Sequence, residues 1–259
     1  MEKCLIFFDI DETLYINKTD TIPESAVEAI HKLKAAGHTL AIATGRSEFE
    51  IIRAVRDLPF DIYVMTNGQH VVQNGNLIYE NPIDVEIIKQ LINKADKEGI
   101  YLGLVSASKA TVTGFTDEMQ KNMEDINAEI PIPTIDSKLY EKESILQMWV
   151  FSEKFDEFKV GFEESVRFVP WIDPGGDILP IGTSKASGIK KLIEANDGAL
   201  PEKVVFFGDG PNDIEIIQLA DIGVAMGNAV DSLKEHADFV TKSIEDNGIY
   251  YACEELGLF

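Results

Sequence analysis

Four aspartates stand just after apolar runs of strand length, and their spacing suggests shared chemistry. Asp9 and Asp11 come after the run CLIFF near the N-terminus, and Asp209 and Asp213 come after the run VVFF near the C-terminus. Residues i and i+2 of an extended segment point to the same side, so Asp9 and Asp11 should share one mouth of a sheet. Like charges 4 Å apart repel by about 4 kcal/mol at an effective dielectric near 20, so a cation should lie among them. A ligand set of oxygens, without His or Cys, favours Mg²⁺ over zinc or copper.

Donor groups follow a third apolar run, LAIA. The hydroxyl of Thr44 and the adjacent amide of Gly45, at a strand-to-helix turn, can bind an anion, although Thr44 is also a plausible helix N-cap. Arg46 either reaches a bound anion or pairs with an acid on the surface. Lys185, in the stretch GTSK, could stabilise the Asp9 carboxylate with its ammonium group, although an isolated lysine is usually a surface residue.

Strand and helix patterns alternate at both ends of the sequence. Before residue 80, buried-strand runs at 4–8, 39–43 and 62–65 alternate with helical patterns at 23–36 and 48–55, and an NGN turn predicts a hairpin. From Lys185 onward, helices at 186–195 and 213–219 alternate with strands at 204–207 and 222–225, followed by closing segments near Phe239 and at 249–256. This order predicts an α/β fold with a doubly wound, mostly parallel, Rossmann-like sheet. The carboxyl ends of such strands surround one crevice, which would bring the polar segments together.

The middle of the sequence has a different pattern. A helix at 85–97, a polar helical stretch at 117–127 and strand-like runs at 101–105, 111–113, 146–151 and 167–171 suggest an antiparallel α+β region. We therefore predict a core made of residues 1–82 and 181–259, with a second domain, 83–180, inserted between its two pieces. Trp149 and Trp171 are expected in the packing of that domain.

Composition limits the partners and the compartment. The 259 residues carry 23 Lys and Arg against 45 Asp and Glu, so the formal charge is 23 − 45 = −22. The electric field of this negative charge repels nucleic acid and anionic lipid. The apolar run near the N-terminus has five residues, far short of the roughly 20 residues of a membrane span. Cys4 and Cys253 form no Cys-x-x-Cys pair, so neither a disulfide framework nor a zinc cluster is expected, and a reduced cytoplasm is the expected location. The dispersed histidines, expected at the surface or as caps, are His31, His38, His70 and His236.

These segments resemble the four ordered motifs of the haloacid dehalogenase (HAD) superfamily phosphatases. The motifs are DIDET at 9–13, Thr44, Lys185 and GDGPND at 208–213, and the resemblance covers nearly the whole chain, including DIGVAMGN at 221–228. The position of the insertion is similar to the Cof-type subgroup with a large α/β cap, which includes many sugar-phosphate phosphatases. The chain departs from the family at Glu12, where most members have Gly, and a non-Gly residue narrows the backbone choices in that turn.

The resemblance implies a mechanism for a small phosphorylated metabolite, with sugar phosphates as the first expectation. Asp9 would attack phosphorus and form an aspartyl-phosphate, and Asp11 would act as general acid and then as general base. Mg²⁺ would be held by the side chains of Asp9 and Asp209 and the backbone carbonyl of Asp11, with Asp213 binding a metal water or supporting the ligands. The expected phosphate contacts are Thr44, Gly45, Arg46, Lys185 and Asn212.

Two other functions remain open on the sequence alone. Phosphotransfer to a sugar, as in the related phosphomannomutases, would use the same catalytic residues. A non-catalytic module that binds a phosphorylated metabolite would not need Asp9, Asp11, Lys185 and Asp209 together, so the intact set argues against it. Asp177 and the pair Asn67-Gly68 are hypotheses for contacts to the substrate.

Overall fold

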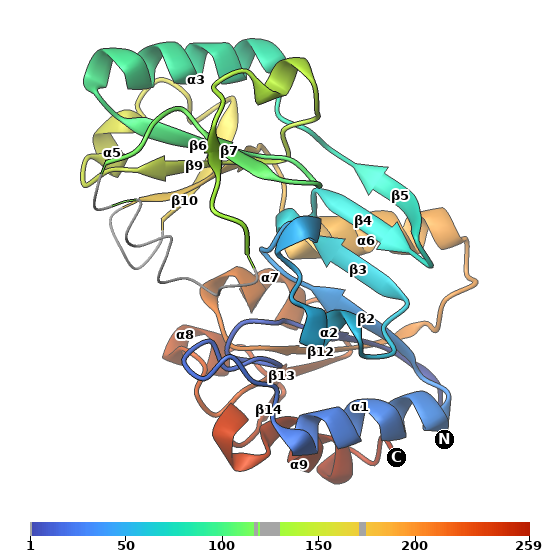
Figure 1. The fold of residues 1–259 in the computed structure, drawn as a ribbon. Coiled ribbons are helices and arrows are strands. Elements are labelled where there is room, and N and C mark those ends of the chain that lie inside the picture. The colour runs from blue at the N-terminus through green and yellow to red at the C-terminus, as the bar shows by residue number, and fades with distance from the viewer. Residues whose placement is uncertain (1, 117–118, 120–129, 171–174) are drawn as a thin grey trace. The chain divides into compact units, whose positions relative to one another are not determined.

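The computed structural model describes residues 2–116, 119, 130–170 and 175–259 (Figure 1). The chain divides into two compact units. The core unit contains the chain up to Arg46, then Ile51–Tyr79 and Ser184–Phe259, and the inserted unit contains Ser47–Glu50 and Glu80–Thr183. The short segment Ser47–Glu50 belongs to the inserted unit although it directly follows Arg46, which the sequence pattern did not indicate.

The core unit is built on an eight-stranded sheet with the order β14-β13-β12-β1-β2-β3-β4-β5 (Figure 1). From β14 to β3 every pair is parallel, and β4 pairs antiparallel with β3. The strands are β1 (Cys4–Phe8), β2 (Thr39–Ala43), β3 (Ile62–Met65), β4 (His70–Gln73), β5 (Asn76–Glu80), β12 (Lys203–Gly208), β13 (Ile222–Ala225) and β14 (Phe239–Val240). All five residues of β1 are buried, as expected of a strand with packing on both faces. The predicted doubly wound α/β fold with a mostly parallel sheet is confirmed.

Helices flank this sheet and begin and end at recognisable signals. The helices are α1 (Glu24–Ala36), α2 (Arg53–Arg56), α6 (Lys185–Asn196), α7 (Ile214–Ile217), α8 (Asp231–Lys234) and α9 (Gly248–Glu255). α1 follows Pro23 and ends at Gly37, whose φ of 86° is easily adopted by glycine. The hydroxyl of Ser184 caps α6 by accepting a hydrogen bond from the amide of Ser187. That cap places Lys185 at the first position of the helix.

The inserted unit contains a six-stranded sheet with the order β10-β11-β9-β6-β7-β8. Its strands are β6 (Tyr101–Val105), β7 (Ala110–Val112), β8 (Thr134–Ile135), β9 (Gln147–Phe151), β10 (Val166–Pro170) and β11 (Gly176–Pro180). The helices in its described part are α3 (Val85–Glu98) and α5 (Phe155–Phe158). Residues from α3, α5 and the central strands form its apolar core, with Leu91, Leu102 and Phe158 fully buried. The pairs are antiparallel except β7 with β8, which is parallel, so the expectation of an antiparallel region needs that correction.

Some local predictions were wrong for identifiable reasons. The helix expected over 48–55 is a 3₁₀ turn at Glu48–Glu50 followed by α2, because extended backbone at Ile52 lets both Ile51 and Ile52 enter the core. The helix expected over 213–219 is shortened to the 3₁₀ turn Pro211–Asp213 and α7.

The expectation of surface or capping histidines fails at two of the four positions. His38 and His70 are buried, with 3% and 5% of their surface exposed. The His38 ring accepts the amide of Cys4 and contacts the carbonyl of Leu258, which ties β1 to the C-terminal segment. Trp171 and nearly all of the helical stretch predicted at 117–127 lie outside the described residues. Within the described ranges, no helix is both long enough and apolar enough to cross a membrane.

Candidate active site

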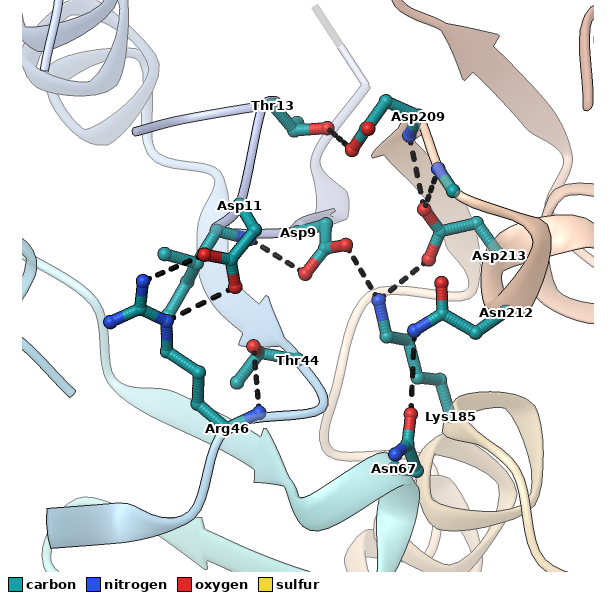
Figure 2. A network of polar contacts seen from close by, with 12 residues as sticks. Asp9, Asp11, Thr13, Thr44, Arg46, Asn67, Lys185, Asp209, Asn212 and Asp213 are labelled. Carbon is teal, nitrogen blue, oxygen red and sulfur yellow. Dashed lines mark hydrogen bonds and ion pairs between the residues drawn. The ribbon is translucent and has the colours of Figure 1, made fainter. Parts of the chain in front are cut away.

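Three polar segments meet at the carboxyl ends of β1, β2 and β12 (Figure 2). Phe8, the last residue of β1, pairs with Ile42 of β2 on one side and with Phe207 of β12 on the other. The amide of Asp9 continues the ladder by donating to the carbonyl of Phe207 at 2.9 Å. The chain runs outward in opposite directions from β1 and β12, so this is the topological switch point where open α/β sheets bind ligands.

A buried ammonium lies between two carboxylates of this site. Lys185 Nζ is 2.7 Å from Asp9 Oδ2 and 2.7 Å from Asp213 Oδ1 (Figure 2). The Lys185 side chain is fully buried, so both ion pairs are protected from solvent. The other oxygen of Asp9 accepts the amide of Ile10 at 2.7 Å, and the carboxylate is therefore held on both sides.

Asp213 organises the turn after β12. Its Oδ2 accepts the amides of Asp209 at 3.0 Å and Gly210 at 3.1 Å. A side chain at Gly208 would overlap the Asp213 carboxylate, so only glycine fits there without rearrangement. Asp209 is oriented from the opposite segment, because Thr13 Oγ1 donates to its Oδ1 at 2.8 Å. Each acid is thus fixed by neighbouring groups of the chain.

Arg46 binds Asp11 with two hydrogen bonds. Its Nε donates to Asp11 Oδ2 at 3.0 Å and its Nη2 to Oδ1 at 2.7 Å (Figure 2). Nη2 also donates to Asn17, and the Arg46 guanidinium lies 5.7 Å from the centre of the Tyr15 ring. Arg46 therefore pairs with an acid of the site itself rather than with a surface acid. The buried Thr44 hydroxyl accepts the backbone amide of Arg46 at 3.1 Å, which makes a tight turn after β2.

The remaining predicted residues fall into separate groups. Asn212 Nδ2 donates to Asn67 Oδ1 at a long 3.4 Å, so these amides face each other beside Lys185 (Figure 2). Gly45 lies against the Asn67 side chain. Gly68 has a packing reason, because a Cβ there would overlap the carbonyl of Ser184. Asp177 belongs to the inserted unit, where it accepts a hydrogen bond from Gln147.

Burial and crowding raise the pKa values of two aspartates. Burial raises the pKa of Asp9 well above its ordinary value; Lys185 opposes this shift and the neighbouring aspartates add to it. Burial also raises the pKa of Asp209 to about 7, against the hydrogen bond from Thr13 and with the help of the Asp213 charge. Burial therefore favours the protonated forms of Asp9 and Asp209 in the absence of a bound cation.

The pKa values of Asp11 and Lys185 are set by their partners. Burial alone would raise the pKa of Asp11, but the hydrogen bonds and charge of Arg46 outweigh burial and hold it below the ordinary value. Burial alone would lower the pKa of Lys185, but the charges of Asp213 and Asp9 outweigh it and raise that pKa. Lys185 is therefore an ammonium and Asp11 a carboxylate at neutral pH.

We predict that Asp209 makes the protein less stable as pH rises when divalent cations are absent. Between the ordinary pKa of 3.8 and the raised value of about 7, the folded state binds more protons at Asp209 than the unfolded state does. The contribution of Asp209 to the free energy of unfolding is therefore largest below pH 4 and is lost as pH rises through 7.

The test is urea unfolding in EDTA between pH 4 and pH 8, on the wild type and on Asp209→Asn. Asparagine can still accept the Thr13 hydrogen bond but does not titrate in this range. The free energy of unfolding of the wild type, minus that of the variant, should fall as pH rises. A flat difference would show that Asp209 has an ordinary pKa in the folded state.

Comparison with known proteins identifies the family to which this chain belongs. The model of the haloacid dehalogenase-like hydrolases matches residues 6–253. The chain belongs to this family. It is 38% identical to YkrA of Bacillus subtilis, named as a candidate phosphatase, over 261 residues that cover 100% of this chain and 99% of YkrA.

Two further matches agree with this family. The chain is 35% identical to a Streptococcus pyogenes protein named as a candidate bifunctional phosphatase and peptidyl-prolyl cis-trans isomerase; the match covers 98% of this chain but only 54% of that protein. The solved structure of BT4131, described as a HAD subclass IIB sugar phosphatase, matches with a TM-score of 0.86 and 30% identity over 99% of this chain and 100% of that one. The predicted resemblance to Cof-type HAD phosphatases is confirmed, and the protein is a phosphatase that acts on phosphorylated substrates.

The donor set of this HAD phosphatase fits a hard divalent cation. Carboxylate oxygens of Asp9, Asp209 and Asp213 lie within 4.8 Å of one another, with neither His nor Cys among them. Oxygen ligands of this kind suit Mg²⁺ or Ca²⁺ rather than softer metals. Burial is the main cause of the raised pKa values of Asp9 and Asp209, and a cation bound to their oxygens would favour the ionised carboxylates again.

Sequence reasoning included Thr13 in a motif but gave it no role in orienting Asp209. Thr13 ends the first motif, and its distance of four residues from Asp9 in the DIDET stretch was the available signal. Glu12, at the position where the family resemblance leads us to expect Gly, has a left-handed φ of 54°. Hydrogen bonds hold that conformation: the Glu12 side chain accepts the amide of Asn17, and its carbonyl accepts Asn228 Nδ2 at 2.7 Å. The glutamate is thus accommodated in a turn that favours glycine.

Proposed function

We propose that the protein is a Mg²⁺-dependent phosphomonoester hydrolase for small phosphorylated metabolites, with sugar phosphates as the substrate class. The observation that carries the proposal is the Asp9 carboxylate, held between Lys185 and the amide of Ile10 and within 4.8 Å of two further carboxylates. A fixed carboxylate beside an ammonium and a cation site is equipped to attack a phosphate ester. The match to a sugar phosphatase supports the substrate class.

Asp9 is the proposed nucleophile. One of its oxygens forms a bond to phosphorus while the bond from phosphorus to the ester oxygen breaks, which gives an aspartyl-phosphate. Water then attacks phosphorus, the bond to Asp9 breaks, and the carboxylate is restored. The Lys185 ammonium, 2.7 Å from Asp9, keeps the carboxylate oriented and offsets the charge of the approaching phosphate.

Asp11 is the proposed general acid and base. It gives a proton to the departing alkoxide and then accepts one from the attacking water, so each step prepares it for the other. The two hydrogen bonds from Arg46 favour the ionised form of Asp11, which is the form that acts as a base. Asp11 must be protonated to act as an acid, so we expect these hydrogen bonds to weaken before that step.

The cation site and the phosphate donors complete the proposed machinery. Mg²⁺ would be held by Asp9 and Asp209 with the backbone carbonyl of Asp11, while Asp213, whose oxygens already accept three hydrogen bonds, would support the ligands. When bound, Mg²⁺ neutralises phosphate charge and orients a phosphate oxygen. Thr44, Gly45 and Asn212 are the proposed donors to the phosphate.

The inserted unit is the proposed cap. We assign catalysis to residues 1–82 and 181–259, and exclusion of water and choice of the leaving group to residues 83–180. The separate apolar core of the inserted unit supports this division, because it lets that part of the chain fold around its own packing.

We predict that removing divalent cations abolishes turnover and that Mg²⁺ restores it. The purified protein is incubated with a panel of phosphate esters in EDTA or in excess Mg²⁺, and inorganic phosphate is measured. Release is expected only with Mg²⁺, with at least one sugar phosphate among the best substrates. Mg²⁺ should also raise the Tm, since it binds the folded site alone.

Other outcomes of this panel would contradict the proposal. Equal phosphate release in EDTA would rule out the metal requirement. Phosphate that appears only on an added sugar acceptor, without free phosphate, would indicate a phosphotransferase instead. Binding of esters with no turnover under any condition would indicate a binding module.

A further inference from the structure

The chain turns back sharply at residues 10–15, directly after β1. The carbonyl of Ile10 accepts the amide of Leu14 at 2.9 Å, which closes this 10–15 turn. Glu12 lies at the bend with a left-handed φ of 54°, a conformation that costs free energy for a residue with a side chain. Its two neighbours in the chain are Asp11 and Thr13. The positions of both therefore depend on whether Glu12 keeps this conformation.

The side chain of Asn228, three residues after β13, contacts the bend. Its Nδ2 donates to the carbonyl of Glu12 at 2.7 Å, and its Oδ1 accepts the amide of Ile244 at 2.9 Å. A carbonyl oxygen only accepts and a backbone N–H only donates, so these partners determine which end of the Asn228 side chain faces each of them. An ionised aspartate here could still accept from Ile244 but could not donate to Glu12. The contact with the bend therefore requires a donor, which asparagine supplies.

The segment that carries Asn228 is also bonded to the turn after β12. The amide of Met226 donates to the carbonyl of Gly208 at 2.9 Å, and the amide of Val230 donates to the carbonyl of Asp209 at 3.0 Å. Both bonds join main-chain atoms on either side of Asn228, so they hold its backbone against that turn. The Asn228 side chain therefore links the 10–15 turn to the turn that carries Asp209.

We propose that Asn228 is a positioning residue for the reaction. By holding the carbonyl of Glu12, it keeps the 10–15 turn in register with the turn after β12, so that Thr13 Oγ1 donates to Asp209 Oδ1 at 2.8 Å (Figure 2). The same contact fixes Asp11, on the other side of Glu12. The inference rests on the proposed function, because that function assigns the reaction to carboxylates of these two turns. Small displacements of such groups slow a reaction strongly.

Substitutions at both ends of the contact test this role. Asn228→Ala removes both hydrogen bonds of the side chain, whereas Asn228→Asp removes only the one to Glu12. Each should lower kcat about tenfold for the phosphate ester hydrolysed fastest with Mg²⁺, and leave KM within about twofold of the wild type. Glu12→Gly adopts the left-handed conformation without help. In that background, either Asn228 substitution should change kcat by less than about threefold.

Hydrogen exchange reports on the turn without relying on turnover. In Asn228→Ala the peptide that contains Leu14 and Tyr15 should exchange about tenfold faster, while peptides elsewhere in the core sheet keep the wild-type rate. Asn76→Ala is the matched control, because Asn76 Nδ2 also donates to the carbonyl of a residue with left-handed backbone, Asn74, whose φ is 51°. That pair lies in the β4–β5 hairpin, so its loss should change neither kcat nor exchange at the 10–15 turn.

Each outcome supports or overturns the role of Asn228. A loss of kcat that is equally large in the Glu12→Gly background would show that Asn228 does not act through the bend. Faster exchange throughout the core unit would show that Asn228 only stabilises the fold, and Asn228→Asp, which keeps the bond to Ile244, repeats the test if Asn228→Ala unfolds. Unchanged kcat in both Asn228 variants, with Asp9→Asn inactive, would overturn this inference alone. A wild type that hydrolyses no phosphate ester would overturn the proposed function, and this inference with it.

Discussion

Replacing Asp9 with asparagine is expected to lower kcat for phosphate esters by about 10⁴-fold or more, equivalent to about 5 kcal/mol of transition-state stabilisation. The amide has nearly the same shape as the carboxylate, but its neutral oxygen is a poor nucleophile. Lys185 keeps Asp213 as a partner at 2.7 Å, so the ammonium is not left alone. Burial already disfavours the charged form of Asp9, so removing that charge should not unfold the protein.

The measurement pairs steady-state release of phosphate with thermal unfolding. Asp9→Asn should lose turnover while its Tm stays within a few degrees of the wild type. Asp57→Asn is the matched control, because it makes the same change at an exposed carboxylate that is 3.5 Å from Arg53. A kcat for Asp9→Asn within tenfold of the wild type would show that another group attacks phosphorus.

The arrangement of the main strands was predictable because the signal is local and repeated. The runs CLIFF, LAIA and VVFF are continuously apolar, and β1 is buried along its whole length. Such runs fit strands covered on both faces, and alternation with helical patterns then predicts parallel pairing. The strand ends bring Asp9, Asp209 and Asp213 together, which follows from this topology alone.

The individual contacts were less predictable because they depend on side chains distant in sequence. Arg46 is long enough to reach a phosphate or any nearby acid, and only the folded turn selects Asp11 as its partner. Ile51 and Ile52 fit a helical pattern, but packing favours a break that buries both. The hydrogen bond from Gln147 to Asp177 gave no signal either, since it joins adjacent strands whose residues are thirty positions apart in the sequence.

Replacing Lys185 with methionine is expected to have the largest effect on stability. Lys185 is fully buried and contacts Asp9 and Asp213 at 2.7 Å each, so its removal leaves buried carboxylates without their cation. Breaking a buried ion pair in this way destabilises a protein by about 3–5 kcal/mol. Methionine keeps most of the side-chain length, so the decrease in the free energy of unfolding comes from the missing charge rather than from a cavity. Phosphatase activity should disappear as well, because Asp9 loses its orienting partner.

The same substitution on the exposed side of α6 gives the control for this prediction. Lys191 is half-exposed and pairs with the exposed Glu194, so Lys191→Met should change the free energy of unfolding by less than about 0.5 kcal/mol. Without divalent cations, Lys185→Met should lower the free energy of unfolding less at pH 5 than at pH 8. At the lower pH the carboxylates that have lost the Lys185 ammonium can take up protons and become neutral. Mg²⁺ should stabilise Lys185→Met more than the wild type, because in the variant it supplies the only cation among Asp9, Asp209 and Asp213. Equal unfolding free energies for the two variants would show that the Lys185 ion pairs contribute nothing to stability.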